Sequence, residues 1–163
     1  MTHDEYNLCI DTWSDDLYRF ACHCCNGTNG ASDVVQEAYA TLWEQHATVA
    51  LDEARRFLFV VAQRRIADAY RSNQRHQALE PLLATDEQSD NSAATHFELR
   101  DLVSTALQQL SEQQRAILTL HDVEGYDYDE IAQMMQMSYT QVQVTTFRAR
   151  IRLKKILTKI GYQ

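Results

Sequence analysis

One stretch decides the fold of the C-terminal third of the chain: residues 127–157, DYDEIAQMMQMSYTQVQVTTFRARIRLKKIL. It opens with the helix-capping pattern Asp127-x-x-Glu130, and a second such pattern, Ser138-x-x-Gln141, follows. The spacing predicts a short helix from Tyr128 to Met135, a tight connection and a longer helix towards Ile160. This is the layout of a helix-turn-helix, whose second helix is free to enter a DNA major groove.

The longer helix has two chemically different faces. Apolar residues recur at spacings of three and four, which predicts a buried stripe of Val142, Thr146, Ala149, Leu153, Ile156 and Ile160. On the other face, glutamine can bond an adenine edge, threonine or valine can meet a thymine methyl, and basic side chains can hold phosphates. The residues expected to contact DNA are Ser138, Thr140, Gln141, Gln143, Val144, Phe147, Arg148, Arg150, Lys154 and Lys155. An ordinary helical hairpin with a solvated basic tail remains the alternative at this point.

The chain upstream also reads as helices. Apolar residues at helical period predict a helix over Ser32–His46, with Ser32 as its N-cap, and a long helix from about Glu53 to Arg75. Two further capping patterns, Thr95-x-x-Glu98 and Ser111-x-x-Gln114, predict helix starts. No strand-like alternation competes anywhere, so the predicted fold is all-α.

Residues 81–94 separate two helical parts. They hold the only proline, Pro81, and an acidic, polar run at 86–92, which is typical of a flexible linker. We therefore predict two small helical domains, 1–80 and 95–163, joined by a flexible acidic linker. Nothing in the sequence indicates that the two domains keep one arrangement.

The charge is distributed unevenly. The formal net charge is −8, which argues against indiscriminate nucleic-acid binding. Every basic residue after Arg115 nevertheless lies at or beyond Arg148, and no acidic residue follows Arg148. This pattern indicates weak binding to bare DNA, assisted by a partner. Residues 1–16 do not look like a signal peptide and no apolar run is long enough for a membrane span, so we expect a cytoplasmic protein without membrane contact.

Metal binding and catalysis are not indicated. Cys22, Cys24 and Cys25 are too crowded for the usual spaced ligand pairs, and no second Cys/His pair follows. We expect reduced thiols, no metal and no other cofactor. His121 and Asp122 are the one imaginable acid/base pair, but no nucleophile or metal set accompanies them, so we expect no catalytic residues and no enzyme.

Two stretches resemble one protein family. Residues 107–157 resemble region 4 of the extracytoplasmic-function (ECF) sigma factors, within the sigma-70 family of RNA polymerase sigma factors. The matching positions are Leu110, Gln114, Arg115, Leu118, Leu120, Glu124, Gly125, Tyr128, Glu130, Ile131, Ala132, Ser138, Val142, Arg148, Ala149, Arg150 and Leu153. Upstream, DVVQEAYATLW at 33–43 resembles region 2.2, and 57–75 resembles regions 2.3 and 2.4. Two motifs in the family's order are far more specific than one helix-turn-helix.

The resemblance implies a mechanism and partners. The first domain would grip the clamp coiled coil of core RNA polymerase through Asp33, Gln36 and Glu37. It would also open the promoter −10 element and capture bases of the melted non-template strand in a pocket formed by the loop at about 46–52. The residues that would face that strand are Arg64, Arg65, Arg71 and Arg75. The second domain would contact the polymerase flap and read the double-stranded −35 element, and an anti-sigma factor is an expected regulator. Trp43, Phe57 and Phe59 are expected in the core.

The chain also departs from the family. Residues 143–146 carry no cation where the family usually has small and basic residues, and Arg64 stands where asparagine is common. The promoter sequence therefore cannot be borrowed from other members. The missing cations favour an alternative, a sigma-like decoy that titrates an anti-sigma factor without using DNA, whereas Arg71, Arg75 and the cluster from Arg148 to Lys155 favour an initiation factor. A plain dimeric helix-turn-helix regulator would leave the region 2 resemblance unexplained.

Overall fold

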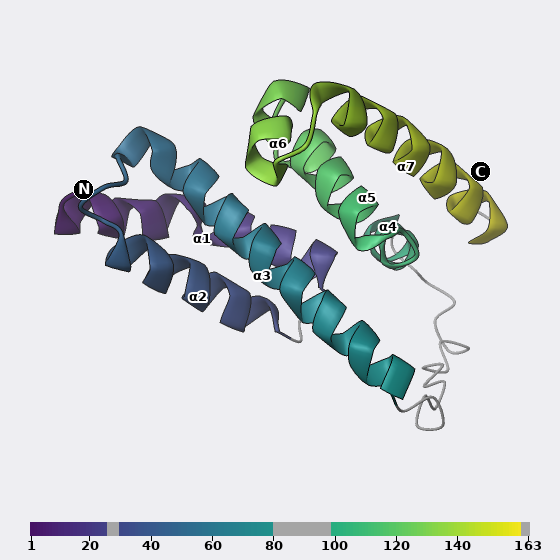
Figure 1. The fold of residues 1–163 in the computed structure, drawn as a ribbon, viewed down its shortest axis with the longest axis horizontal. Helices are drawn as coiled ribbons and strands as arrows, with labels where there is room; N and C mark the ends of the chain where they lie inside the picture. The colour runs from purple at the N-terminus through teal and green to yellow at the C-terminus, as the bar shows by residue number, and fades with distance from the viewer. Residues whose placement is uncertain (26–29, 80–98, 161–163) are drawn as a thin grey trace.

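The described part of the chain is helical. A computed structural model describes residues 1–25, 30–79 and 99–160, apart from the side chains of 76–79 and 99–100, and these ranges contain no strand. The elements are α1 (His3–Cys24), α2 (Ala31–Glu44), α3 (Leu51–Leu79), α4 (Leu99–Gln108), α5 (Glu112–Leu118), the π-helical turn η2 (Thr119–Val123), α6 (Tyr128–Met135) and α7 (Tyr139–Ile160) (Figure 1). None of these helices is long and apolar enough to cross a membrane. The predicted linker and the capping pattern at Thr95 lie outside the described residues.

Most of the predicted helix starts are confirmed. Ser111, Asp127 and Ser138 each accept from the backbone N–H three residues later, and the side chain of that third residue accepts in return from the cap's own N–H. Thr2 caps α1 in the same way through Glu5, which the sequence analysis missed. Each box satisfies two backbone donors that the first helical turn leaves without a partner.

The start of α2 differs from the prediction. Gly30, not Ser32, occupies the cap position, with a left-handed backbone (φ +85°) and no side-chain hydrogen bond. Its carbonyl accepts from the Val34 N–H at 3.0 Å, so the helix is already under way when the chain reaches Ser32. Glycine takes this conformation without the steric cost that a Cβ would add.

The N-terminal half is a bundle of α1, α2 and α3. Its fully buried side chains come from all three helices: Leu17 and Phe20 from α1, Leu42 from α2, and Leu58 and Phe59 from α3. The Phe20 and Phe59 rings meet edge to face with centroids 5.3 Å apart, a favoured aromatic geometry. The prediction that Phe59 is a core residue is therefore confirmed.

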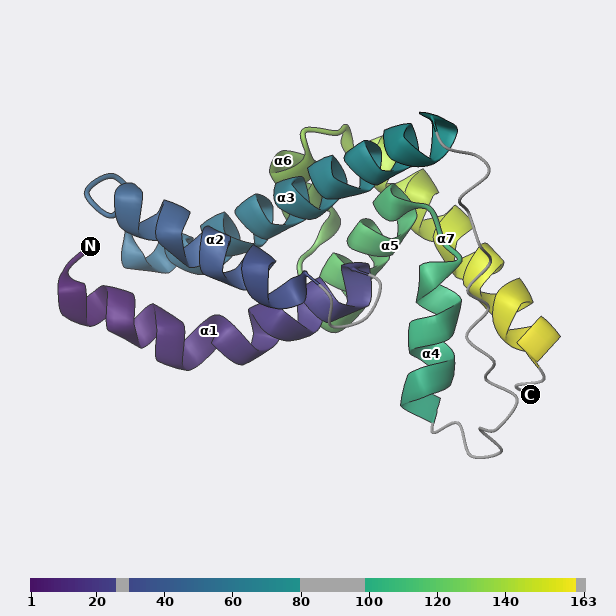
Figure 2. The same cartoon turned by 90° about the horizontal axis from the view of Figure 1, so that it is seen from below.

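The C-terminal half is built around α5. Figures 1 and 2 show α5 between α3 and α7, with α4 set against the side of α7. A small core joins α4, α5 and α7 through Ala106, Leu107, Leu110, Leu118, Ala149 and Ile156. The stripe predicted for α7 is buried at Val142, Thr146, Ala149 and Ile156, whereas Ile160 is 38% exposed, so its assignment to the stripe was wrong.

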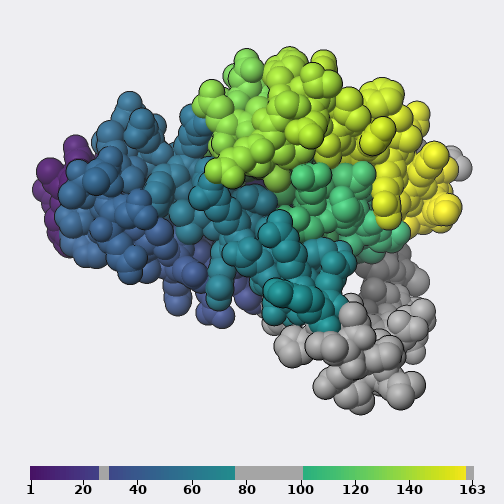
Figure 3. Space-filling model, in the orientation of Figure 1, coloured from purple at the N-terminus to yellow at the C-terminus, as the bar shows by residue number. Residues whose placement is uncertain are grey.

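The two halves share a hydrophobic core. Ile117, Leu120, Tyr126, Ile131 and Met134 belong to the same buried cluster as the side chains that hold α1, α2 and α3 together. In the space-filling view the C-terminal helices lie directly on α3 (Figure 3). The sequence indicated no fixed arrangement, but burial of this apolar surface provides a reason for one.

A buried carboxylate lies at the junction of the halves. The Glu124 side chain, just after η2, is 0% exposed. Arg19 of α1 donates to both of its oxygens at 3.1 and 3.2 Å, and Arg55 of α3 donates at 3.2 Å. The Arg55 guanidinium also lies 4.8 Å from the Phe59 ring centroid and 4.9 Å from that of Tyr126. Burial raises the pKa of Glu124 in spite of both arginines, so the carboxylate depends on these partners.

A second polar contact joins the halves at the end of α1. The Gln108 amide, at the end of α4, donates to the carbonyls of His23 and Cys25 at 3.2 and 3.0 Å, and Arg115 in turn donates to the Gln108 oxygen at 3.4 Å. The last carbonyls of a helix lack partners within the helix. Gln108 therefore caps α1 from the other half of the chain.

Loss of Arg55 should weaken the contact between the two halves at Glu124. Arg55→Ala is expected to lower the free energy of unfolding by about 1–3 kcal/mol, the cost of removing one partner of a buried polar group, while Arg19 still holds Glu124. The matched control is Arg56→Ala, because Arg56 donates to the exposed Gln133 side chain; its effect should stay within about 0.5 kcal/mol. Urea unfolding followed by circular dichroism measures both variants, and equal losses would contradict a special role for Arg55.

Candidate nucleic-acid interface

Helices α6 and α7 form the predicted helix-turn-helix. Buried Ile131 and Met134 of α6 and Val142 of α7 hold the two helices together. Between them Gln136 takes a left-handed backbone (φ 55°), and the Met137 N–H closes back onto the Ala132 carbonyl at 2.9 Å. A left-handed residue at a helix end turns the chain sharply, at some cost for a side chain other than glycine. The tight connection, predicted at Gln136, Met137 and Ser138, is thus confirmed, whereas the left-handed backbone of Gln136 was not predicted.

The predicted reading face of α7 is open to solvent. The residues that it exposes are Ser138, Thr140, Gln141, Gln143, Val144, Phe147 and Arg148. Phe147 is 66% exposed and Val144 40% exposed. A hollow of about 570 Å³ runs along one side of this face, between the 135–137 connection and Thr140, Gln141, Val144 and Arg148. The first turns of α7 therefore present amide, hydroxyl and apolar groups together.

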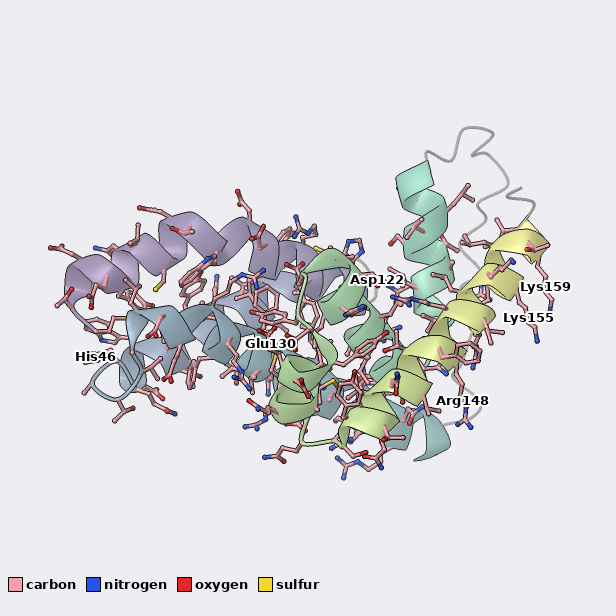
Figure 4. The ribbon with its side chains drawn as sticks, turned by 90° about the horizontal axis from the view of Figure 1, so that it is seen from above. His46, Asp122, Glu130, Arg148, Lys155 and Lys159 are labelled. Atoms are coloured by element: carbon pink, nitrogen blue, oxygen red, sulfur yellow. The ribbon has the colours of Figure 1, made fainter. Side chains whose placement is uncertain are left out.

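The cations of α7 follow the reading face. Arg148, Lys155 and Lys159 project from the same side of α7 (Figure 4). Among the described residues, no ion pair within 4.0 Å is formed by Arg148, Arg152, Lys154, Lys155 or Lys159. Unpaired cations behind a polar reading face are suited to DNA phosphates.

Arg150 is placed differently from the prediction. It forms a two-point ion pair with Asp122 of η2, with Nη2–Oδ1 at 2.6 Å and Nε–Oδ2 at 3.4 Å. The hydrogen bond to Asp122 raises the pKa of Arg150, so the guanidinium stays protonated. The structure thus uses Arg150 to tie α7 to η2, and phosphate contact by this residue stays a prediction.

The four arginines expected at the −10 element do not share one face. Arg64 and Arg71 of α3 line a hollow of about 270 Å³, opposite Glu112 of α5 and residues 134–136 of α6. Arg75 lies next along α3 and lines a neighbouring hollow with Arg71. Arg65 instead turns towards α2, where it pairs with Glu37 at 2.7 Å. The structure therefore brings together Arg64, Arg71 and Arg75, but not Arg65.

Glu112 adds a carboxylate opposite these arginines. Burial raises the pKa of Glu112, while a hydrogen bond from Gln63 at 3.4 Å and the charge of Arg71 lower it. The packed arrangement thus places an acidic group of the C-terminal half within electrostatic reach of Arg71.

The residues expected to bind polymerase are accessible on α2. Asp33, Gln36 and Glu37 are all exposed, and their spacing places them on one face of the helix. Asp33 also borders a hollow of about 440 Å³ whose lining includes Cys24, Arg65 and Arg115. Glu37 is the one of the three that carries an ion pair, with Arg65, among the described residues.

Trp43 is not the core residue that the sequence suggested. It is 40% exposed at the end of α2, where it stacks on His46 with ring centroids 4.3 Å apart. Tyr6 and His3 of α1 approach its other sides, at 5.0 and 5.6 Å. This aromatic group packs beside the loop at 45–50, and His46 lies at the opposite end of the molecule from Lys159 (Figure 4). Phe57 is half-buried against the core.

Three of the four cysteines are free thiols at the end of α1, and the fourth, Cys9, is a buried free thiol earlier in the same helix. Cys24 is buried, and Cys22 and Cys25 are half-buried. Burial raises the pKa of Cys24 to about 12 and also raises that of Cys25. Because thiolates are the metal ligands and nucleophiles, these two protonated thiols are suited to packing. Glu124, Gln108 and Glu112 make polar contacts between the halves, which the capping and periodicity patterns did not predict.

Comparisons with known proteins agree with this architecture. Residues 9–76 match the model of Sigma-70 region 2, and residues 100–153 match that of Sigma-70, region 4. The chain is 26% identical over 162 residues to the ECF RNA polymerase sigma factor SigX of Bacillus subtilis, which covers 93% of this chain and 83% of SigX. It is 24% identical to SigM of the same organism over 161 residues, covering 98% of this chain and 97% of SigM.

A solved structure has the same fold. The sigma factor RpoE of Bartonella quintana, in complex with the anti-sigma factor NepR, superposes with a TM-score of 0.75 over 94% of this chain and 96% of that one, at 18% identity. The models of two regions of one family thus match this chain in order. Each match covers a helical half, and the second half contains the helix-turn-helix. This chain therefore belongs to the ECF group of the sigma-70 family of RNA polymerase sigma factors.

Proposed function

We propose that this chain directs core RNA polymerase to promoters in the cytoplasm. Each of its two halves binds a different part of the polymerase and of the promoter. The N-terminal half, taken as residues 1–80, binds the clamp coiled coil through Asp33, Gln36 and Glu37 and engages the melted −10 strand through α3. The C-terminal half, residues 95–163, contacts the flap and reads the −35 element through α7. The observation that carries the proposal is the open face of α7, where hydrogen-bonding groups in the first turns precede five cations that form no ion pair among the described residues. The chain itself performs no catalysis in this proposal.

The packed arrangement suits a resting state. Arg64 and Arg71 face the C-terminal half, and the charge of Arg71 acts on Glu112. The phosphates of a nucleic-acid backbone would compete with the Glu112 carboxylate for Arg71. Separation of the halves on polymerase would remove Glu112 from the α3 arginines and leave Arg71 with its exposed ion pair to Asp68 of the same helix, at 3.8 Å. The acidic linker at 81–94 then bridges the two halves.

Run-off transcription tests the function directly. Purified core polymerase, the full chain and genomic promoter fragments should yield discrete transcripts that neither protein makes alone. A chain that binds core polymerase or a partner protein but never supports initiation would favour the decoy.

Polymerase binding should depend on the face of α2. Glu37→Arg reverses a charge on that face and should weaken core binding at least about tenfold, through repulsion and loss of complementarity. A pull-down with core enzyme measures this, and circular dichroism checks folding.

Two controls separate the polymerase contact from the internal ion pair. Asp11→Arg makes the same charge change on an exposed position of α1 and should bind normally. The swap Glu37→Arg with Arg65→Glu restores an ion pair between α2 and α3 without restoring the surface charge, and should still bind weakly. Full binding by the swap would show that only the internal pair matters.

Base preference at the −35 element should depend on Gln143. Gln143→Ala is expected to relax preference at one position, at a cost of about 1–3 kcal/mol there. Binding of holoenzyme to a library of −35 variants measures the preference at every position. Gln109→Ala, an exposed glutamine outside the helix-turn-helix, is the matched control. An unchanged profile for Gln143→Ala would place the reading register elsewhere.

A protein partner should compete with core polymerase for this chain. Exposed apolar side chains such as Leu8, Tyr18 and Val123 offer contact surface on both halves, and the Bartonella relative was solved with an anti-sigma factor bound. Affinity purification from unstressed cells should recover a further stoichiometric protein, which purified core polymerase then displaces. Recovery of core subunits alone, at full occupancy, would rule out control by occlusion.

A further inference from the structure

The centre of the exposed face of α7 is apolar. Val142, Thr146, Ala149 and Ile156 point into the protein, and at 3.6 residues per turn the positions opposite them are 140, 144, 147 and 151. We call Thr140, Val144, Phe147 and Ile151 the α7 ridge. Val144, Phe147 and Ile151 are 40%, 66% and 43% exposed, and Phe147 is the most exposed large hydrophobic side chain among the described residues.

An exposed apolar ridge with a polar rim marks a contact surface. The rim here is cationic or neutral, because no acidic residue follows Glu130 in the sequence, and Arg148, Lys154 and Lys155 flank the ridge. Charge complementarity therefore favours an anionic occupant. The ridge also lies on the second helix of a helix-turn-helix, the element that enters the DNA major groove.

The major groove offers one kind of apolar group, the C5-methyl of thymine. Guanine is most often read by arginine or lysine. Residues 139–147 of α7 contain neither. Gln141 and Gln143 lie on either side of the ridge, where an amide can pair with adenine. Thr140 and Ile151 are separated by about 16 Å along the helix, which corresponds to about five base pairs at 3.4 Å each.

We propose that the α7 ridge reads thymine methyl groups, so that this chain recognises its −35 element through A·T pairs rather than through guanine. The inference rests on the proposed reading of the −35 element by α7. Phe147 and Val144 are the specificity-determining residues, and the flanking cations hold the phosphates without regard to sequence.

Replacement of thymine by deoxyuridine tests the methyl group alone, because deoxyuridine keeps the base pair. Promoter fragments transcribed by the holoenzyme are prepared with each −35 thymine replaced in turn. At one position or more, holoenzyme affinity should fall about fourfold, the amount expected for one methyl-sized apolar group. Phe147→Ala or Val144→Ala should abolish this difference at one of those positions, and Phe147→Leu should keep part of it.

Arg152→Ala is the control for phosphate binding. It should weaken all fragments alike and leave the preference for thymine over deoxyuridine unchanged. Circular dichroism of Phe147→Ala should match the parent, since the side chain is solvent-exposed.

Each remaining outcome is decisive. Equal affinity for thymine and deoxyuridine at every −35 position would overturn the inference while leaving the transcripts, and hence the proposed function, intact. Phe147→Ala and Val144→Ala variants that keep the full preference but lose a copurifying protein would assign the ridge to a protein partner instead. Absence of any promoter-specific transcript from unmodified fragments would remove the proposed function itself.

Discussion

The arrangement of this protein depends on one buried carboxylate. Glu124 has no exposed side-chain surface and is held by Arg19 of α1 and Arg55 of α3, so it connects the C-terminal half to two helices of the N-terminal half. The pKa of Glu124 stays raised, which means that the ion pairs only partly offset the loss of water. When the halves part, all three charged groups regain hydration. The ionic contacts therefore specify the register of docking, and the shared apolar core supplies its stability.

This division makes the docking of the two halves specific. Helix α7 packs on α4, α5 and α6, and its reading face stays open. Two of the arginines expected at the −10 element, Arg64 and Arg71, line a hollow opposite Glu112 and the helix-turn-helix connection. The C-terminal half borders these arginines without covering them, since both are exposed and the Arg71 side chain is 70% exposed.

The polar and apolar side chains of the reading face and the cations of α7 occupy different parts of the helix. The first turns of α7 contain amides, hydroxyls and apolar groups, and the positive charge begins only at Arg148. Nearby, Arg150 is drawn back to Asp122. In the proposed function, the first turns of α7 would discriminate between bases and the cations from Arg148 onward would contact phosphates.

The helices, the helix-turn-helix and the open face of α7 could be predicted from the sequence, because capping boxes and 3.6-residue periodicity involve residues only three or four positions apart. Other features depend on residues far apart in the chain. Arg19 and Arg55 are 105 and 69 positions from Glu124, and Arg65 meets Glu37 on a neighbouring helix. Trp43 has an apolar helical position yet lies at the surface, beside Tyr6 and His46. Local patterns determine where helices form and which way they face, whereas the partners of Glu124, Arg65 and Arg150 are decided only when the helices pack.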